Sequence, residues 1–396
     1  MHQQASSNPS DGAASQSEPS GARRLVIISG QAFSLYNFRG PLIRDIVARG
    51  WEVRAIAPDY DGEVRAAVRS LGATPVDCRL SRTGINPLAD VLDCVRMVLL
   101  LRKMKADAVI AYSAKPVIYG TLAAWMAGIP RRYALVTGLG YAFTTSVDEE
   151  NLRKKRWLRA FVSWLYKIAL AKADVVFFHN RDDLAEFVEM GLVERARARS
   201  THGTGIDLRE WPPAPAVTTP ITFLLVGRML HHKGVVEYVE AARRIKATHP
   251  EVRFLLLGGL DSNPSAISET QVVAWVNENI VEWPGHVPVR PWLAQASVFV
   301  LPSYYREGLP RSTQEAMAMA RPVITTDAVG CRDTTVDGEN GFLVPVRDVD
   351  ALEAAMRRFI VEPALIEPMG LASRRLAEQR FDVRLINASM LESMGI

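Results

Sequence analysis

Two cations in the sequence are spaced so that they could hold an anion. Arg228 and Lys233 follow the apolar run 221–226 and Gly227, and they precede a stretch with helical periodicity. Such a site favours phosphate, because fixed cations and the free N–H groups at a helix start attract an anion together. Taken alone, the segment could also be an ordinary turn with two surface cations.

Two carboxylates downstream form a second candidate. Glu307 lies in the segment that follows a predicted strand over 298–301, and Glu315 lies in the early turns of the predicted helix behind it. Ionised carboxylates are strong acceptors, so the two could grip the hydroxyls of a sugar and of a ribose. A capping acid and a surface acid could show the same spacing. The N–H groups left free at this helix start would be those of Leu309, Arg311 and Ser312.

The elements that must position these residues alternate between strand and helix. A helical stretch over 41–49 separates two apolar runs in the first half, and one over 235–248 follows the two cations in the second half. This alternation is typical of a parallel sheet covered on both faces. The predicted fold class is α/β, with two Rossmann-like doubly wound domains that face each other across a cleft, where the carboxyl ends of their strands hold ligands. The predicted strands cover residues 25–29, 52–57, 74–76, 108–111, 132–136 and 175–178, then 221–226, 252–257, 298–301, 323–325 and 342–344.

The chain divides into four segments. Residues 1–20 are rich in Ser, Ala, Gln and Pro and cannot bury enough apolar surface to fold, so we expect a disordered tail. Residues 21–205 form the N-terminal domain, and residues 206–370 form the C-terminal domain, which begins with a Pro-rich stretch. We expect the helical segment 371–396 to pack back on the N-terminal domain.

Composition excludes several classes of protein. Three scattered cysteines, Cys78, Cys94 and Cys331, suit a reducing compartment and indicate neither a disulfide framework nor a structural metal. The formal charge of +4 is modest, and we expect no nucleic-acid partner. No apolar stretch reaches the roughly 20 residues of a membrane span and no secretory signal is recognisable, so we expect a cytoplasmic protein.

One segment is both basic and aromatic, and two interpretations of it stay open. Five cations between Arg153 and Arg159 stand beside several large apolar residues. A basic amphipathic helix of this kind could lie on an anionic membrane. Alternatively, its apolar stripe packs on the protein core while the charges are solvated. The stripe, at spacings of three and four, consists of Trp157, Phe161, Trp164, Leu165 and Ile168.

The motifs together resemble those of one enzyme family. The Glu-Gly-x-Pro sequence at 307–310, with a second glutamate eight positions after the first, follows Gly-Arg at 227–228 and Lys-Gly at 233–234. This pattern resembles the large GT-B family of retaining glycosyltransferases often called family 4. The likeness covers almost everything after the tail, and it also includes residues 37–39, 178–183, 203–207 and 337–344.

The resemblance implies roles for individual residues. Arg228 and Lys233 would bind the donor diphosphate and act in catalysis with Glu307, which would lie beside the donor sugar, and Glu315 would bind the ribose. The donor site would further contain Gly227, Gly258, Gly259, Val287, Gly308, Leu309, Arg311 and Ser312. The N-terminal domain would bind the acceptor, with cleft loops that contain Gly30, Asn37, Arg39, Thr137 and Gly138.

Two features bear on the mechanism. Many relatives carry a His in the loop after the strand that ends at Val136, where this chain has Thr137, so a His-dependent mechanism cannot be assumed. This variant resembles a subgroup that acts on polyprenyl-diphosphate-linked sugars, while His179 near another strand end is interpreted as structural. Asp348 and Asp350 look like a metal-binding Asp-x-Asp but precede a helical run, so capping explains them. We expect neither a metal nor another cofactor, because Arg228 and Lys233 can supply the positive charge.

The predicted reaction transfers a hexose or N-acetylhexosamine from a nucleoside diphosphate sugar, expected to be a UDP-sugar, to a sugar acceptor on polyprenyl diphosphate, in surface polysaccharide or glycan biosynthesis. One alternative is a GDP-mannose-dependent mannosyltransferase that acts on a lipid-linked oligosaccharide. Alternatives of another class are a GT-B nucleotide-sugar epimerase and a non-catalytic nucleotide-sugar-binding protein. With a lipid-linked acceptor, we expect the protein at the inner face of the cytoplasmic membrane, as a peripheral protein.

Overall fold

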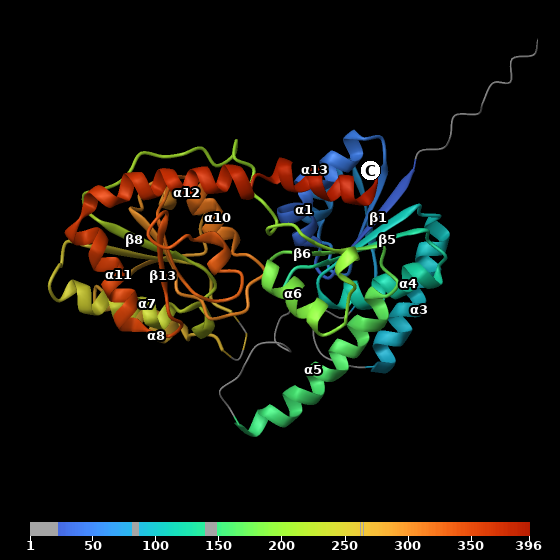
Figure 1. Ribbon diagram of the computed structural model, residues 1–396, viewed down its shortest axis with the longest axis horizontal. Coiled ribbons are helices and arrows are strands. Elements are labelled where there is room, and N and C mark those ends of the chain that lie inside the picture. The colour runs from blue at the N-terminus through green and yellow to red at the C-terminus, as the bar shows by residue number, and fades with distance from the viewer. Residues whose placement is uncertain (1–22, 81–86, 139–148, 262, 264) are drawn as a thin grey trace, which may run out of the picture.

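The computed structural model describes residues 23–80, 87–138, 149–261, 263 and 265–396. The predicted disordered tail, residues 1–20, lies outside this part of the chain. Two α/β domains lie side by side, each built on its own sheet (Figure 1). The predicted fold class is therefore confirmed.

The first domain contains a parallel sheet of seven strands in the order β3-β2-β1-β4-β5-β6-β7. Its inner strands are continuous apolar runs, as in β1, where every residue after Arg24 is buried. Helices cover both faces, so each strand packs against neighbours above and below. The strands are β1 (Arg24–Ser29), β2 (Glu52–Ala57), β3 (Ala73–Asp77), β4 (Ala108–Tyr112), β5 (Arg131–Val136), β6 (Val175–Phe178) and β7 (Ala198–Ser200). The helices are α1 (Ala32–Ala48), α2 (Gly62–Ser70), α3 (Pro87–Met104), α4 (Thr121–Met126), α5 (Glu149–Leu170) and α6 (Arg181–Glu189).

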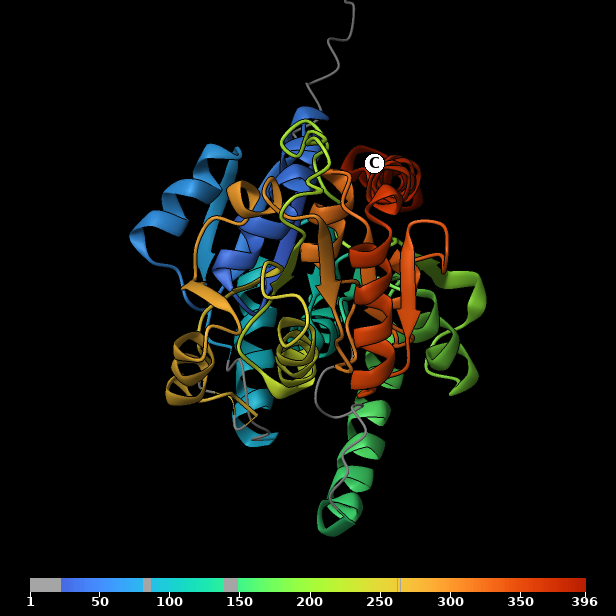
Figure 2. The same cartoon turned by 90° about the vertical axis from the view of Figure 1, so that its left-hand side faces the viewer.

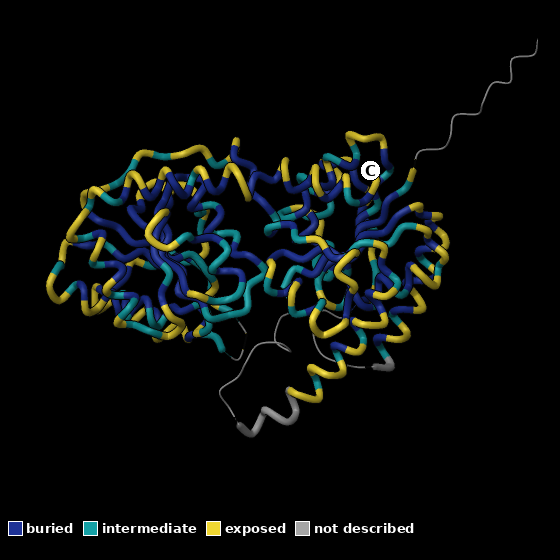
Figure 3. The backbone as a smooth tube through the Cα atoms, viewed as in Figure 1, coloured by how far each residue is buried: buried dark blue, intermediate teal, exposed yellow. Residues whose placement is uncertain are grey.

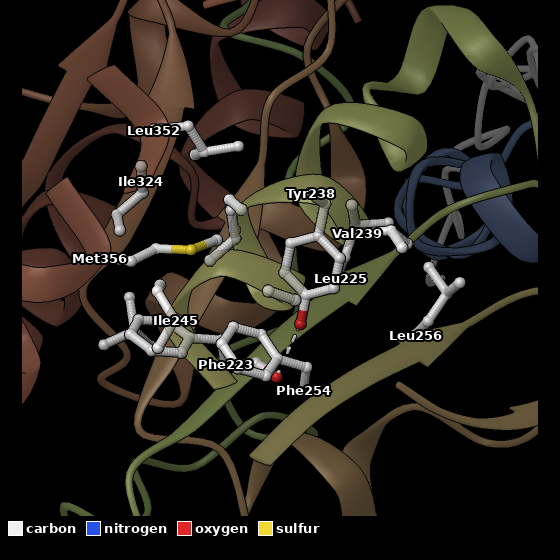
Figure 4. Close-up of a cluster of buried hydrophobic side chains, with 14 of the residues drawn as sticks. Phe223, Leu225, Tyr238, Val239, Ile245, Phe254, Leu256, Ile324, Leu352 and Met356 are labelled. Carbon is white, nitrogen blue, oxygen red and sulfur yellow. Dashed lines mark hydrogen bonds between the residues drawn. The ribbon is translucent and has the colours of Figure 1, made fainter. Parts of the chain in front are cut away.

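The second domain repeats this architecture with six parallel strands in the order β10-β9-β8-β11-β12-β13. Figure 4 shows its core, where Phe223 stacks on Phe254 and the buried Tyr238 hydroxyl donates to the Phe223 carbonyl. The strands are β8 (Thr222–Val226), β9 (Arg253–Leu257), β10 (Glu282–Gly285), β11 (Val298–Leu301), β12 (Val323–Thr326) and β13 (Gly341–Val344). The helices are α7 (Val235–Lys246), α8 (Glu269–Asn277), α9 (Arg290–Leu293), α10 (Arg311–Ala318), α11 (Val349–Val361) and α12 (Ile366–Arg380). The helix that follows, α13 (Val383–Met394), packs on the first domain.

Every strand predicted from the sequence is present, and the structure adds β7 and β10, which the sequence analysis missed. Both are edge strands, with a partner on one side only. Strand β10 contains Pro284 and Gly285, and β7 has only three residues. Neither shows the continuous apolar run of a central strand, because an edge strand does not need one.

Helix α1 begins nine residues earlier than predicted, at Ala32 instead of Pro41, and Pro41 lies inside it. Proline has no N–H to donate to the carbonyl four residues back, which belongs to Asn37. That carbonyl accepts instead from Arg311 of the second domain, at 2.8 Å. Pro41, from which we predicted a helix start, therefore lies inside a continuous helix and leaves the Asn37 carbonyl without its usual partner in that helix.

The chain crosses between the domains twice, and the two crossings lie together. The Ile206 N–H donates to the Phe381 carbonyl, and the Val383 N–H donates to the Ile206 carbonyl. Helix α12 packs on α10 of the second domain, whereas α13 packs on α1 of the first domain. The segment 371–396 is thus divided between the two domains, and the part that packs on the first domain starts at Val383.

Helix α5 leaves the body of the first domain and projects from it in both views (Figures 1 and 2). The interpretation in which its stripe packs on the core is wrong for most of the stripe, since Trp157 is 79% exposed and Trp164 is 55% exposed, and it holds for Leu165, which packs against the first-domain core. The face that packs carries Ser163, Tyr166 and Leu170, which are buried. Figure 3 shows the described outer part of α5 as largely exposed. Among the described residues, no helix is long and apolar enough to cross a bilayer.

Candidate functional site

A cleft with a volume of about 410 Å³ lies between the two domains. Its walls come from loops that follow strands of both sheets, at the carboxyl ends where a doubly wound fold holds ligands. The second domain supplies Gly227, Lys233 and the segment 307–312. From the first domain, Arg39 and Thr137 are the predicted residues that line it. The cleft therefore collects most of the predicted donor residues and two of the acceptor-side residues.

Lys233 and Glu307 form an ion pair inside this cleft, although 74 residues separate them in the sequence. Both side chains are mostly buried, with 15% and 12% of their surface exposed. The Glu307 carboxylate also lies 3.0 Å from the Ser303 hydroxyl. Gly234, with φ of 76°, lets the turn that bears Lys233 approach the end of β11, since a Cβ there would lie 2.1 Å from the Pro302 carbonyl oxygen.

The start of helix α10 forms the floor of the donor side. The Ser312 hydroxyl donates to the Val226 carbonyl at 3.2 Å, which joins the helix to the end of β8. Arg311 pairs with Glu315 one turn later, at 3.0 Å, and its guanidinium lies over the Phe38 ring. Burial raises the pKa of Glu315, and Arg311 opposes this effect. Glu315 thus lies behind Arg311, and it does not line the cleft.

Arg228 differs from Lys233 in its surroundings. Its side chain is 54% exposed and pairs with Asp261 at 2.7 Å, and it is absent from the lining of the cleft. A role for Arg228 on the donor diphosphate stays a prediction, and it requires the side chain to exchange Asp261 for the ligand. The structure brings Lys233 and Glu307 together without Arg228.

Three predicted donor-site residues, Gly258, Gly259 and Val287, lie outside the lining of the cleft, although Gly258 lies against Gly227, which lines it. The Gly227 N–H donates to the Leu257 carbonyl, just before Gly258. A Cβ on Gly258, which has φ of 141°, would lie 1.7 Å from the Gly227 carbonyl oxygen, so only glycine fits this approach. Gly259 accepts from Met229, and Val287 packs against the second-domain core.

On the first-domain side, the backbones of two loops touch. A Cβ on Gly308 would lie 2.0 Å from the Thr137 carbonyl oxygen, and one on Gly138 would lie 3.3 Å from the Gly308 nitrogen. Gly30 faces Pro116 and does not line the cleft, while Asn37 contributes its carbonyl to Arg311. Thr137 and Gly138 therefore lie against the loop that carries Glu307.

Sequence reasoning did not identify one of the buried polar groups of the first-domain wall. His179 was interpreted as structural, yet it lines the cleft, with its Nε2 atom 2.9 Å from the Arg39 guanidinium. Burial lowers the pKa of His179 well below its ordinary value, and the charge of Arg39 acts in the same direction. Tyr112 and Ser34 continue this wall through a 2.7 Å hydrogen bond. His179 and Tyr112 lie at the carboxyl ends of β6 and β4, which was the available signal.

Asn180 links the two domains at the same place. Its side chain accepts from the Asp183 N–H at the start of α6 and donates to the carbonyls of Gly308, at 2.7 Å, and Glu307, at 3.2 Å. Next to it, Arg306 pairs with Asp183 and Glu186. The donor loop of one domain is therefore held by the helix start of the other.

The Asp-x-Asp sequence has another role in the structure. Asp348 accepts from the Ala351 N–H and caps α11, and Asp350 pairs with Arg244. The capping interpretation is confirmed. In the part of the chain that the structure describes, no group of three or more His, Cys, Asp or Glu side chains is placed to hold a metal.

Comparisons with known proteins agree with this architecture. Residues 40–202 match the family model described as glycosyl transferase 4-like domain, and residues 220–362 match the model described as glycosyl transferases group 1.

Among curated proteins, the chain is 29% identical over 345 residues to the N,N′-diacetylbacillosaminyl-diphospho-undecaprenol α-1,3-N-acetylgalactosaminyltransferase of Campylobacter jejuni, covering 83% of this chain and 87% of that protein. It is 26% identical over 316 residues to the UDP-Gal:α-D-GlcNAc-diphosphoundecaprenol α-1,3-galactosyltransferase of Escherichia coli, covering 76% of each chain.

Among solved structures, HepE of Anabaena in complex with UDP aligns with a TM-score of 0.73 at 18% identity, covering 94% of this chain and 99% of that chain.

Proposed function

Because its first domain matches the glycosyl transferase 4-like family and its second domain matches the glycosyl transferases of group 1, the chain belongs to the GT-B glycosyltransferases, and we propose that it is a retaining enzyme that extends a sugar carried on polyprenyl diphosphate. The donor would be a nucleoside diphosphate sugar, in the first instance a UDP-hexose or UDP-N-acetylhexosamine. The product would serve the assembly of a surface polysaccharide or glycan. The names of the two curated relatives, which specify diphospho-undecaprenol acceptors, support this acceptor class.

The observation that carries the proposal is the Lys233–Glu307 pair in the cleft. An ammonium group has three N–H donors, so a single bond to Glu307 leaves Lys233 two for a phosphate. As the bond between the anomeric carbon and the diphosphate breaks, negative charge builds on the departing oxygen. A cation already in place stabilises that charge more than it stabilises the bound donor, which is what accelerates the step.

The interdomain contacts support transfer over hydrolysis. Asn180 and Arg306 hold the Glu307 loop against the first domain, and Thr137 covers Gly308. Contacts of this kind favour closure of the two domains around bound ligands, and a closed cleft would exclude water from the reacting centre and leave the acceptor hydroxyl as the nucleophile within reach.

The test is a transfer assay with the purified full chain. UDP-, GDP- and ADP-sugars are offered with a monosaccharide on polyprenyl diphosphate, and products are identified by mass spectrometry and by the NMR coupling at the anomeric proton. Lys233→Ala and Glu307→Ala should each lower turnover by about 100-fold or more. The matched controls Lys246→Ala and Glu251→Ala, which lie outside the cleft, should keep it. Near-wild-type turnover in either cleft variant would remove the site assignment.

We further propose that the first domain docks on an anionic bilayer through helix α5 and the exposed side of α3. Trp157 and Trp164 are exposed on α5, and the nearby α3 exposes a row of aliphatic side chains. Arg156 and Lys167 add exposed positive charge, while the side chains of residues 153–155 lie outside the described part. Aromatic side chains flanked by cations suit the headgroup region of a membrane that carries negative charge. The exposed α3 side chains are Val91, Leu92, Val95 and Leu99.

Vesicle flotation tests this surface. The double variant Trp157→Ser, Trp164→Ser should lower the partition coefficient onto phosphatidylglycerol vesicles roughly tenfold or more, because the apolar surface of the two tryptophan side chains is then no longer transferred from water into the membrane. Val361→Ser is the control, since Val361 is 82% exposed on α11 of the other domain. Equal flotation of the double variant, or no flotation of the wild type with any lipid, would contradict the proposal.

A further inference from the structure

Arg39 is a buried cation whose charge no acidic side chain balances. Only 4% of its surface is exposed, and within the described residues no carboxylate lies within ion-pair distance of it. Its Nε atom is buried without a hydrogen-bond partner. Leaving a charged group out of water in this way is unfavourable unless something compensates it. Because Arg39 lines the cleft, a ligand there could supply the missing partner.

The contacts that Arg39 makes fix the orientation of its guanidinium but do not neutralise its charge. One terminal nitrogen lies 2.9 Å from Nε2 of His179, and the guanidinium lies over the Tyr112 ring. A guanidinium can only donate, so Nε2 of His179 accepts and the neutral ring carries its proton on Nδ1. Burial lowers the pKa of Arg39 to about 10, and Arg311 acts in the same direction. Arg39 therefore stays charged at neutral pH, held by two uncharged neighbours.

The other cations of the cleft contrast with Arg39. Lys233 is paired with Glu307, and Arg311 is paired with Glu315. Arg39 therefore contributes positive charge that the cleft itself does not neutralise. A planar guanidinium with free N–H groups matches the oxygens of a phosphate.

We infer that Arg39 is a phosphate-binding residue, whose guanidinium, held by His179 and Tyr112, binds an oxygen of a diphosphate group in the cleft from the first-domain side. The inference rests on the proposed function for the class of ligand. Two sources share this chemistry: the diphosphate of the donor and the diphosphate that links the acceptor sugar to its lipid.

Equilibrium binding by calorimetry tests the inference without turnover. The probes are UDP and uridine for the donor side, and farnesyl diphosphate and farnesol for the lipid side. Arg39→Gln removes the charge, and Arg39→Lys keeps the charge but loses the planar fork. Arg49→Gln is the control, because Arg49 is an exposed cation just after the same helix and outside the cleft.

If Arg39 binds the donor, Arg39→Gln weakens UDP binding about tenfold or more and leaves uridine unchanged, since a charge-assisted hydrogen bond is lost. If it binds the acceptor, farnesyl diphosphate weakens by the same factor, while UDP and farnesol do not. Arg39→Lys should follow Arg39→Gln with a smaller loss, and it decides the question if Arg39→Gln does not fold.

Wild-type affinity for both diphosphates in the folded variants would overturn the inference. A parallel loss of uridine and UDP would also overturn it, because Arg39 would then support the fold of the cleft. A transfer assay that fails with every donor would instead count against the proposed function, while the binding results would stand by themselves.

Discussion

Replacing Asn180 by serine should loosen the donor loop without harming the helix that Asn180 caps. The Asn180 side chain is completely buried, and it both caps α6 and holds the donor loop. Its oxygen accepts from the Asp183 N–H, and its nitrogen donates to the Gly308 and Glu307 carbonyls. Serine is a good helix cap, but its side chain is too short to reach the second domain. The variant therefore keeps the cap but removes the bonds from Asn180 to the second domain, together with the bond from the same nitrogen to the Asp183 carboxylate at 3.0 Å.

The magnitude follows from the bonds that are lost. Two carbonyls lose a buried donor, and at about 1 kcal/mol for a net hydrogen bond the loop loses roughly 1–2 kcal/mol. Asn180→Ala also removes the cap, which adds about 1 kcal/mol at the start of α6. A change of about 1.4 kcal/mol in local opening corresponds to about tenfold faster hydrogen exchange.

Hydrogen exchange followed by mass spectrometry separates the two effects. In Asn180→Ser, exchange in the segment 304–309 should rise about tenfold while α6 stays as in the wild type, whereas Asn180→Ala should speed both. Ser268→Ala is the control, because it removes the cap of α8 in the second domain and leaves the link intact. Wild-type exchange in segment 304–309 of Asn180→Ser would refute the reasoning.

Three further experiments probe other features. Gly258→Ala should lower the midpoint of thermal unfolding by many degrees, because the added Cβ would meet the Gly227 carbonyl oxygen. The control Gly62→Ala, whose added Cβ would meet no atom within 4 Å, should keep the midpoint within about 2 °C of the wild type. Equal midpoints for the two variants would contradict this. The free energy of unfolding should fall as pH drops below 6.5, the ordinary pKa of the His179 ring, because only the unfolded state then takes up that proton. His179 should contribute up to about 1.4 kcal/mol per pH unit to this pH dependence. Urea unfolding of His179→Gln at pH 7.5 and 5.5 should show a pH dependence that is smaller by this contribution. The same pH dependence as in the wild type would argue against a buried neutral ring. Burial raises the pKa of Cys331 to about 12, so iodoacetamide at pH 8 should label it only after unfolding; rapid labelling of the folded chain would show that the thiol is accessible.

The donor side could be predicted because its residues follow strands directly. Lys233 comes after β8 and Glu307 after β11, and these strands are neighbours in the sheet. Parallel neighbours bring their carboxyl ends to one edge, so the order of apolar runs already placed the cation near the carboxylate. For the same reason Thr137, after β5, was expected at the cleft and lines it.

Other features depend on partners that no local pattern reveals. Arg39 meets His179 across 140 residues, and a single histidine after a strand is equally compatible with a structural role. The turn of Arg228 toward Asp261 depends on a loop conformation that composition does not encode. The apolar stripe of α5 has the spacing of a packed helix. The helix extends past the body of the domain, however, so most of the stripe has no protein surface to pack against.

The return of α13 to the first domain affects the order in which the chain can mature. Ile386, Met390, Leu391 and Met394 belong to the first domain's own hydrophobic core, yet they follow the whole second domain in the sequence. While the second domain is synthesised, the α1 surface that α13 covers has no partner within the nascent chain. The N-terminal domain therefore reaches its complete core only after the second domain and α13 have been synthesised, and loss of α13 should impair the domain that is made first.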